Sequence, residues 1–276
     1  MNRRALKLSL AALPLLALAA AASTSAPFEA GPYRAEDEQD VQARYELVAA
    51  SEDRAAMVAL WRDQPDMALV TFDADLERSL SLWEASPEKP PTEEIAKLHR
   101  RALFAARAAS EALGTPIFAD YAASFVSWDD QQKRDFRDGQ KIVGASRKAL
   151  EEGEAGRAVE LAMNGIARTS YLGDWWGLAM SHAARGRAMQ ASSSFGHALT
   201  AYSQARQLYH DLHLTRSELA NLRYMINMLL LLENWPRAEV ACEDALRLAR
   251  ESGAEESVAQ ELEGSLARVR EALRVK

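Results

Sequence analysis

The 276-residue sequence has one cysteine, Cys242, and few β-branched residues, and these shortages limit the fold it can adopt. A single cysteine cannot form an intrachain disulfide, so the stability of the fold must come from packing. A chain rich in alanine, leucine, arginine and glutamate favours helices over strands. We therefore expect an all-α protein in which Cys242 is a small buried hydrophobic side chain.

The sequence also lacks the common signatures of catalysis: it has no Gly-x-Ser-x-Gly elbow, no His-Glu-x-x-His pair and no phosphate-binding loop. Cys242 has no partnered base that would make it a nucleophile. Asp129 and Asp130 stand at an expected helix start, where their charges would complement the helix dipole. His210 and His213 could share a helix face, but zinc needs three or four ligands and no third is identifiable. We expect a protein that is not an enzyme and uses no metal or cofactor.

Positive charge is outweighed by negative charge along the chain. The sequence has 33 basic and 40 acidic residues, a formal net charge of −7. Removing residues 1–26 leaves 30 basic and 40 acidic residues, and a net charge of −10. Binding to nucleic acid requires a basic face that neutralises phosphates, so we expect no nucleic-acid partner.

Apolar runs long enough to span a membrane are missing. Arg3, Arg4 and Lys7 precede an alanine-rich apolar stretch of about 15 residues, whereas a transmembrane helix needs about 20. Residues 1–26 therefore predict an export signal, cleaved near residues 22–26, and a periplasmic or secreted bacterial protein without stable membrane insertion afterwards. An uncleaved anchor is the alternative. The arginine pair fits a twin-arginine signal only loosely. We do not expect a bacterial lipoprotein, because no cysteine lies near the cleavage site.

Two segments precede the regular part of the chain. Residues 27–40 contain proline, glycine and an acidic run, and we expect a flexible, solvated linker there. Residues 41–91 carry two apolar stripes at helical spacing, which predict a pair of helices, with Ser51 as an N-terminal cap. Thr92 is expected to cap the helix that follows the proline-rich break.

A 40-residue repeat organises the remainder. A small-large-small pattern occurs at Ala198-Tyr202-Ala205, at Ala238-Cys242-Ala245 and, more weakly, at Ala158-Ala162-Gly165. A helix wedged between two others needs small residues one turn apart, so that backbones can approach, and a larger residue between them. Fixed periods of this size are typical of helical solenoids.

Four copies of the repeat fit within residues 92–255. Their expected bounds are about 96–135, 136–175, 176–215 and 216–255. Residues 256–276 are apolar on one side and rich in Glu, Gln and Arg on the other, as expected of a terminal capping helix.

The spacing of these small and large residues resembles the second-helix motif of the tetratricopeptide repeat. Gly186 falls where that family has a close-packing glycine, whereas His182, which we expect to be a hydrogen-bonded core residue, replaces its aromatic side chain. The 40-residue period is longer than the usual 34. The resemblance implies a right-handed α-solenoid of helical hairpins. Long, divergent repeats of this kind are also similar to those preceding CHAT-type peptidase domains.

One column of residues suggests a binding surface. The positions at one 40-residue phase are Arg107, Arg147, Arg187 and Asn227. First helices of such hairpins line the concave face of a solenoid, so equivalent side chains stack along its groove. Arginine binds carboxylates through two parallel hydrogen bonds, so the column predicts an acidic peptide or a chain terminus as ligand. Nearby expected groove residues are Gln190, Arg223 and Tyr224. A solvated face patterned with Arg–Glu pairs would explain the column equally simply.

Two functions stay open on the sequence. The first is a non-catalytic exported scaffold or adaptor that binds a peptide segment or partner protein in its groove. The alternative is a helical accessory arm of an envelope enzyme system, such as a CHAT-type peptidase or a peptidoglycan-acting enzyme, with its catalytic domain on another chain. A neighbouring reading frame encoding such a domain would separate the two.

Overall fold

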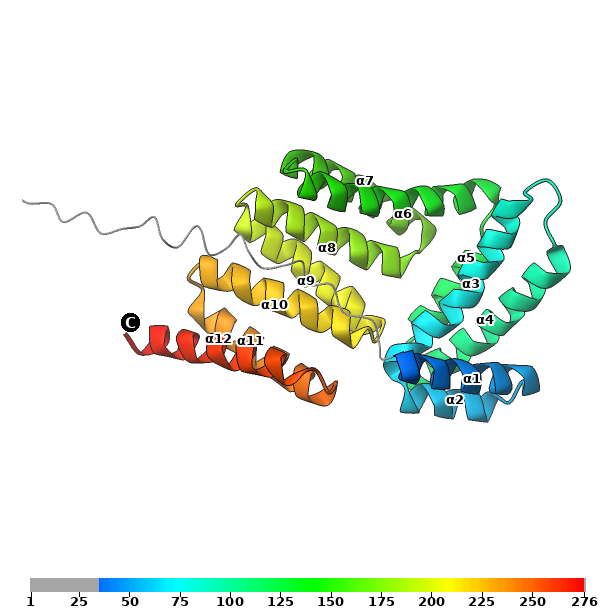
Figure 1. The fold of residues 1–276 in the computed structure, drawn as a ribbon, viewed down its shortest axis with the longest axis horizontal. Coiled ribbons are helices and arrows are strands. Elements are labelled where there is room, and N and C mark those ends of the chain that lie inside the picture. The colour runs from blue at the N-terminus through cyan, green and yellow to red at the C-terminus, as the bar shows by residue number, and fades with distance from the viewer. Residues whose placement is uncertain (1–34, 276) are drawn as a thin grey trace, which may run out of the picture.

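The computed structural model describes the backbone of residues 35–275 and the side chains of residues 39–275, and its regular structure is entirely helical. Twelve α-helices and one short 3-10 helix, with no strand in the described range, confirm the all-α prediction (Figure 1). No helix between residues 35 and 275 combines the length and the apolar character that a membrane span requires. The predicted export signal, residues 1–26, lies outside the described residues.

The first part of the molecule, residues 35–127, is called the N-terminal bundle below. Its elements are α1 (Ala35–Ser51), α2 (Arg54–Asp63), the 3-10 helix η2 (Pro65–Met67), α3 (Ala68–Ala85), α4 (Thr92–Leu113) and α5 (Ile117–Ser127).

The second part, residues 130–275, is called the hairpin series. It consists of α6 (Asp130–Glu151), α7 (Ala155–Leu172), α8 (Trp175–Ala191), α9 (Phe195–Asp211), α10 (Thr215–Leu231), α11 (Trp235–Glu251) and α12 (Glu256–Val275). Each of these helices packs against the next one along the chain (Figure 1).

The N-terminal bundle differs from the sequence prediction at four points. Helix α1 begins at Ala35, so the expected linker is wrong for its last six residues, and three helices replace the expected pair. Ser51 ends α1, and the side chain of Asp53 caps α2 by accepting the Ala56 amide at 3.0 Å. Thr92 begins α4 without a capping bond. Helix α1 was missed because its stretch is strongly charged and the apolar stripe along it is weak.

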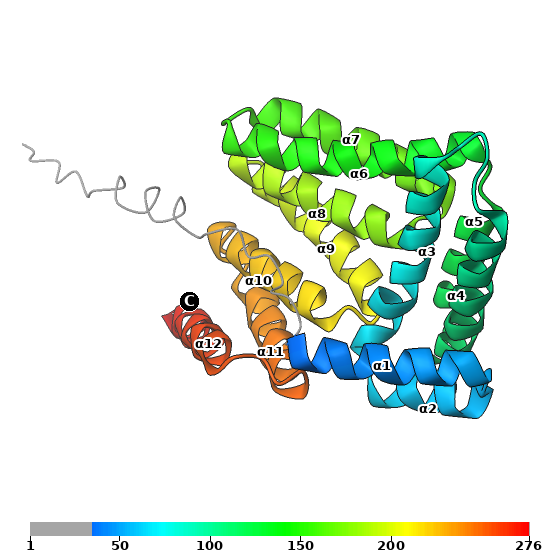
Figure 2. The same cartoon turned by 45° about the vertical axis from the view of Figure 1, so that its right-hand side comes forward.

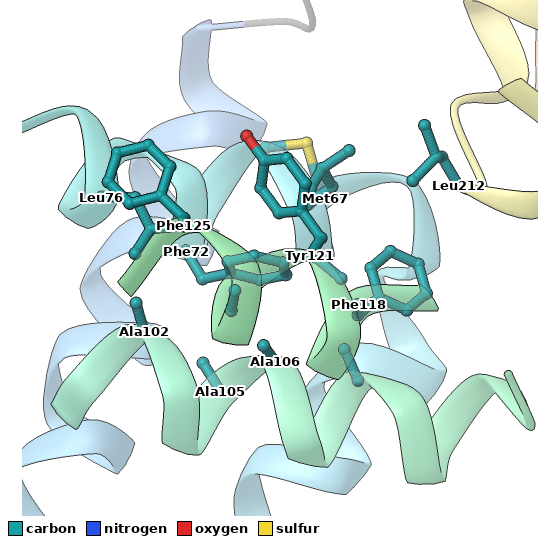
Figure 3. Close-up of a cluster of buried hydrophobic side chains, with 14 of the residues drawn as sticks. Met67, Phe72, Leu76, Ala102, Ala105, Ala106, Phe118, Tyr121, Phe125 and Leu212 are labelled. Carbon is teal, nitrogen blue, oxygen red and sulfur yellow. The ribbon is translucent and has the colours of Figure 1, made fainter. Parts of the chain in front are cut away.

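Aromatic side chains fill the core of the N-terminal bundle. Phe72 of α3 lies edge-on to Phe118 of α5, with ring centroids 6.3 Å apart, and both rest on alanines of α4 (Figure 3). The indole Nε1 of Trp61 donates to the carbonyl of Ala105 at 3.1 Å, which ties α2 to α4. The small side chains of α4 thus let large rings approach its backbone from two sides.

The turns of the hairpin series repeat every 20 residues. A left-handed residue (φ between 51° and 79°) follows each helix from α6 to α11. These residues are Gly153, Gly173, Ser193, His213, Glu233 and Gly253. At each turn the next amide donates back to a carbonyl five residues earlier, as from Ser194 to Met189 at 2.8 Å. This bond identifies the Schellman type of helix end. Half of the six positions are not glycine, although glycine is the usual residue there.

Small residues allow the helices of the series to pack closely. The three positions of each sequence motif are buried on α7, α9 and α11. On α8, Gly186 lies under the ring of Tyr202, where an added Cβ would stand only 2.6 Å from the ring. Tyr202 in turn stacks on Tyr224 of α10, with centroids 4.9 Å apart. The close approach of α8 and α9 therefore depends on glycine, which has no side chain, at position 186.

The hairpin series curves back onto the N-terminal bundle at the turn between α9 and α10 (Figure 2). Leu212 joins the aromatic core of the bundle (Figure 3), and the ring of His213 lies 6.1 Å from that of Phe118. The hydroxyl of Thr215 donates to the carboxylate of Asp66, at η2. The α9–α10 turn therefore holds the hairpin series against the bundle through Leu212, His213 and Thr215.

Candidate functional site

A cavity of about 420 Å³ lies across three alternate helices of the hairpin series, and it is called the arginine cavity. Helix α6 contributes Arg147, and α8 contributes Arg187 one repeat later. Aromatic walls come from Trp176, Tyr209 and Tyr224. Among the described residues, the lining of the cavity includes two arginines and no acidic side chain. The cavity thus brings two guanidinium groups together with an aromatic wall.

Two buried polar atoms at this cavity lack a hydrogen-bond partner among the described residues. Asn221 is only 4% exposed, and its Nδ2 donates to the Ser217 carbonyl at 2.8 Å while its Oδ1 has no donor. The Nε of Arg187 has no acceptor. Buried polar groups in folded proteins are usually satisfied, so an unpaired acceptor and an unpaired donor in one cavity favour a ligand that supplies both.

A second cavity of about 380 Å³ adjoins the first and is called the aspartate cavity. The two cavities share the side chains of Gln140, Val143, Trp176 and Met180, so they adjoin each other, and together they are called the cleft. The far wall of the aspartate cavity comes from the N-terminal bundle, which contributes Asp73, Glu77 and Tyr121. The cleft therefore runs from α10 to the bundle.

Two buried carboxylates define the aspartate cavity. Asp73 accepts the hydroxyl proton of Tyr121 at 2.6 Å, and Asp174, which caps α8, accepts the Gly177 amide at 2.8 Å. Burial raises the pKa of Asp73 to about 7, helped by the charges of Glu77 and Asp174 and opposed by the Tyr121 bond. Burial also raises the pKa of Asp174 to about 6. Both groups therefore titrate near neutral pH.

Glu77, the third acid of this cavity, has a cationic partner. Arg137 of α6 donates to Glu77 at 2.5 Å and to Glu84 at 2.9 Å, linking α6 to α3. No Lys or Arg among the described residues is paired in this way with Asp73 or Asp174. The cavity thus keeps two acidic groups whose charge is not balanced by an ion pair.

The structure brings together only some of the residues predicted for the groove. Arg147, Arg187 and Tyr224 line the arginine cavity. Arg107 lies exposed on α4 of the bundle, and Asn227 lies exposed on α10, outside the lining. Arg107 and Asn227 therefore do not share the cavity with Arg147 and Arg187. In the case of Arg107, the reason is that α4 belongs to the bundle and does not continue the register of the series.

Two further predicted groove residues have structural partners. Arg223 is buried, and its guanidinium pairs with Glu261 of α12, so the groove assignment is wrong for this residue. Gln190 accepts the hydroxyl proton of Tyr202 at 2.8 Å and does not line either cavity. Both side chains support the packing of the series.

Sequence reasoning missed the aspartate cavity. Its one sequence signal is the presence of Asp73 within the apolar stripe of α3, directly beside Phe72, where a carboxylate must be buried. Asp174 gives no such signal, because an aspartate before a helix is an ordinary cap. Only the fold brings these two residues to one cavity.

The remaining candidates for chemistry have other roles. Cys242 is buried, and burial raises the pKa of its thiol to about 11, so it stays protonated near neutral pH. His210 lies 3.1 Å from Glu218, and no group of three potential metal ligands occurs among the described residues. Asp129 forms a capping box with Gln132, in agreement with its predicted place at a helix start.

His182 does not behave as predicted. Its Nδ1 is buried without a hydrogen-bond partner among the described residues, so the expected hydrogen-bonded core histidine is wrong. Burial, together with Arg185, lowers the pKa of His182 to about 4. The imidazole is therefore neutral at neutral pH.

Comparisons with known proteins add no relative to this description: no protein-family model matches the chain, and no curated protein sequence matches it. The cleft must be interpreted from its own geometry.

Proposed function

We propose that this protein is a non-catalytic scaffold, a right-handed α-solenoid of long tetratricopeptide-like hairpins, that binds a peptide bearing a carboxylate. The carboxylate, from an acidic side chain or a chain terminus, binds at Arg147 and Arg187. The sequence of residues 1–26 supports action after export from the cytoplasm. Support for the repeat class comes from the 20-residue spacing of the turns and the small residues at the packing positions.

The observation that carries this proposal is the meeting of Arg147 and Arg187 in one cavity. They lie 40 residues apart on alternate helices, and no acidic side chain in the described part of the chain lines the cavity. Arginine forks match carboxylates in a bidentate geometry, and they do so most strongly where water is partly excluded. The unpaired Nε of Arg187 offers a donor, and the unpaired Oδ1 of Asn221 offers an acceptor for a peptide N–H.

The aromatic wall of the arginine cavity would contact the part of the peptide that does not carry the carboxylate. Trp176 and Tyr209 offer apolar surface to a peptide backbone or an aliphatic side chain, while the stack of Tyr202 and Tyr224 keeps one wall rigid. Rigid aromatic surfaces lose little entropy on binding, so they contribute affinity without ordering costs. A short segment of a partner protein fits this arrangement.

The test compares labelled hexapeptides in free-acid and amidated form against wild type and the Arg147→Gln/Arg187→Gln double variant. We expect free acids to bind more tightly, and the double variant to weaken them at least about tenfold per arginine, because charge-assisted hydrogen bonds contribute roughly 1.5–3 kcal/mol each. Arg107→Gln is the matched control, since it removes one exposed arginine outside the cleft. Raising the salt concentration should reduce the difference. Equal affinity of the double variant and wild type would disprove the proposal.

A further inference from the structure

Helix α3 carries two buried aspartates that differ in one partner. Asp73 is 7% exposed and Asp75 is 4% exposed. Each accepts a tyrosine hydroxyl, Asp73 from Tyr121 at 2.6 Å and Asp75 from Tyr45 at 2.5 Å. Asp75 is also paired with the guanidinium of Arg101. The two sites differ in that Asp75 has a direct ion pair, whereas the nearest cation that acts on Asp73, Arg137, is bound to Glu77 and Glu84.

The difference matters because a buried carboxylate without a cation is costly. Removing such a charge from water is expensive unless it is paired and hydrogen-bonded. Asp73 and Asp174 each have one hydrogen bond named above and no ion pair with Lys or Arg in the described chain. The charge of Asp174 also opposes ionisation of Asp73. A cation that entered the cavity would relieve both groups at once.

The walls of the aspartate cavity suit an organic cation. Phe136, Trp176 and Tyr121 line it together with Met180, and aromatic faces attract ammonium groups. A hydrated inorganic ion would gain little from such apolar walls, whereas an alkylammonium can place its chain against them. Trp176 and Met180 also line the arginine cavity, so the two cavities adjoin at these side chains.

We propose that the aspartate cavity is a second binding site, which takes a protonated amine between Asp73 and Asp174. Together with the arginine cavity it makes the cleft specific for ligands that carry an ammonium group at one end and a carboxylate at the other. The ammonium site stands on the geometry of α3 and the α7–α8 turn alone, whereas the zwitterionic ligand also rests on the proposed function.

The unpaired Oδ1 of Asn221 agrees with a ligand that donates hydrogen bonds within the same cleft. Because this atom belongs to α10 and the aspartates belong to α3 and the α7–α8 turn, the polar contacts come from separate elements. A ligand that reached all three would therefore lie along the cleft.

The test uses three probes of the same chain length: 6-aminohexanoate, hexanoate and hexylammonium. Binding is followed by NMR through the side-chain signals of Trp176, which lines both cavities, and Tyr121, which lines only the aspartate cavity. We expect 6-aminohexanoate to bind wild type at least about tenfold more tightly than hexanoate, the gain of one charged contact. Hexylammonium should shift the Tyr121 signals.

Two variants remove the charge and keep the structure. Asp73→Asn retains an oxygen for the Tyr121 hydroxyl, and Asp174→Asn retains a good helix cap. Each should reduce the advantage of 6-aminohexanoate over hexanoate to less than about threefold and leave hexanoate binding unchanged. Asp120→Asn, an exposed acid on α5, is the matched control. Thermal melts of all variants show that they are folded.

The outcomes separate the two proposals. If 6-aminohexanoate binds no more tightly than hexanoate, or if no amine shifts the Tyr121 signals, the ammonium site is disproved. If Asp73→Asn weakens both amines while Arg147→Gln/Arg187→Gln changes nothing, the ammonium site holds and the carboxylate function fails. Nα-acetyllysine and Nε-acetyllysine then show whether a lysine side chain or an α-amine is the better source of the ammonium group.

Discussion

The N-terminal bundle and the hairpin series stabilise helices in different ways. In the bundle, large aromatic rings meet in one core, and buried tyrosines bond to aspartates distant in sequence, such as Tyr121 to Asp73. In the series, small residues bring each helix close to its neighbours, and a separate core between α6, α7 and α8 centres on three buried alanines. The bundle is thus a cooperative unit, whereas stability in the series is expected to be a sum over neighbours.

This difference shapes the cleft. One wall of the aspartate cavity is formed by the bundle, while the arginine cavity is formed mainly by alternate helices of the series. Relative motion of neighbouring hairpins would alter the arginine cavity more than the acidic wall. We therefore expect the acidic wall to keep its shape more strictly than the arginine cavity does.

The largest expected effect is from Phe72→Ala in the bundle. Phe72 is fully buried, and truncating a core phenylalanine typically costs about 3–5 kcal/mol. Amide hydrogen exchange should show loss of protection throughout the bundle. Leu262→Ala on α12, also buried, should lower protection in α11 and α12 alone. A uniform loss along the chain in both variants would contradict the distinction.

The two aspartates of α3 should respond in opposite directions. Asp75→Asn breaks a buried ion pair with Arg101, and we expect a loss of about 2–4 kcal/mol. Asp73→Asn removes an unpaired buried charge, so it should raise the free energy of unfolding at pH 8 by about 1–2 kcal/mol. Urea titrations of the two variants measure both values. If Asp73→Asn lowered the free energy of unfolding at pH 8, the ionised carboxylate of Asp73 would be stabilised in the folded protein, contrary to this prediction.

The pH dependence of stability tests the same contrast. The folded pKa of Asp73, about 7, lies above the unfolded value of about 3.9, so the folded state holds the extra proton between these pH values. Wild type should therefore lose stability as pH rises from about 4 to about 7, and Asp73→Asn should lose less. Tyr121, Glu77 and Arg137 also face this carboxylate, and Asp174, with a pKa of about 6, leaves a residual slope. If the free energy of unfolding fell equally steeply with pH in wild type and in Asp73→Asn, Asp73 would be excluded as the cause of the pH dependence.

A smaller effect is expected from Gly186→Ala in the series. The added Cβ would stand 2.6 Å from the ring of Tyr202, and overpacking of this kind costs about 1–3 kcal/mol. Gly156→Ala is the control, because a Cβ added there would meet nothing within 4 Å and alanine favours helices. Thermal melts of both variants give the comparison. Equal melting temperatures would show that α8 and α9 can move apart without cost.

The smallest effect concerns the turns. Glu233 has φ of 51°, a conformation that costs about 1 kcal/mol for residues other than glycine. Glu233→Gly should therefore stabilise the series by about 0.5–1 kcal/mol, since glycine is the usual residue at this position. Gly253→Ala at the equivalent turn should destabilise it by a similar amount. Chemical denaturation measures both, and two changes of the same sign would contradict the assignment.

The sequence was sufficient for the helical class, because this class depends on composition and local periodicity. The 40-residue spacing also relates Arg147 to Arg187, which line one cavity. Helix α1 could not be predicted, since its stretch is charged and its place is set by the packing of Val41 and Tyr45 in the bundle. The aspartate cavity was also beyond reach, because Asp73 and Asp174 belong to segments that no repeat relates.

The contact between the α9–α10 turn and the bundle constrains how such a chain could change in length. Thr215 and Leu212 meet the bundle at Asp66 and the aromatic core, so α6 to α9 span a fixed gap. Inserting a hairpin within that span would carry the turn past its docking point and open the cleft. Duplication beyond α10 would leave the contact intact. A 40-residue duplication there would add two helices and keep the alternation between helices that line the cleft and helices that do not. A 20-residue duplication would add one helix and reverse this alternation for every helix that follows. Growth of this architecture is therefore restricted to its C-terminal end and to even numbers of helices.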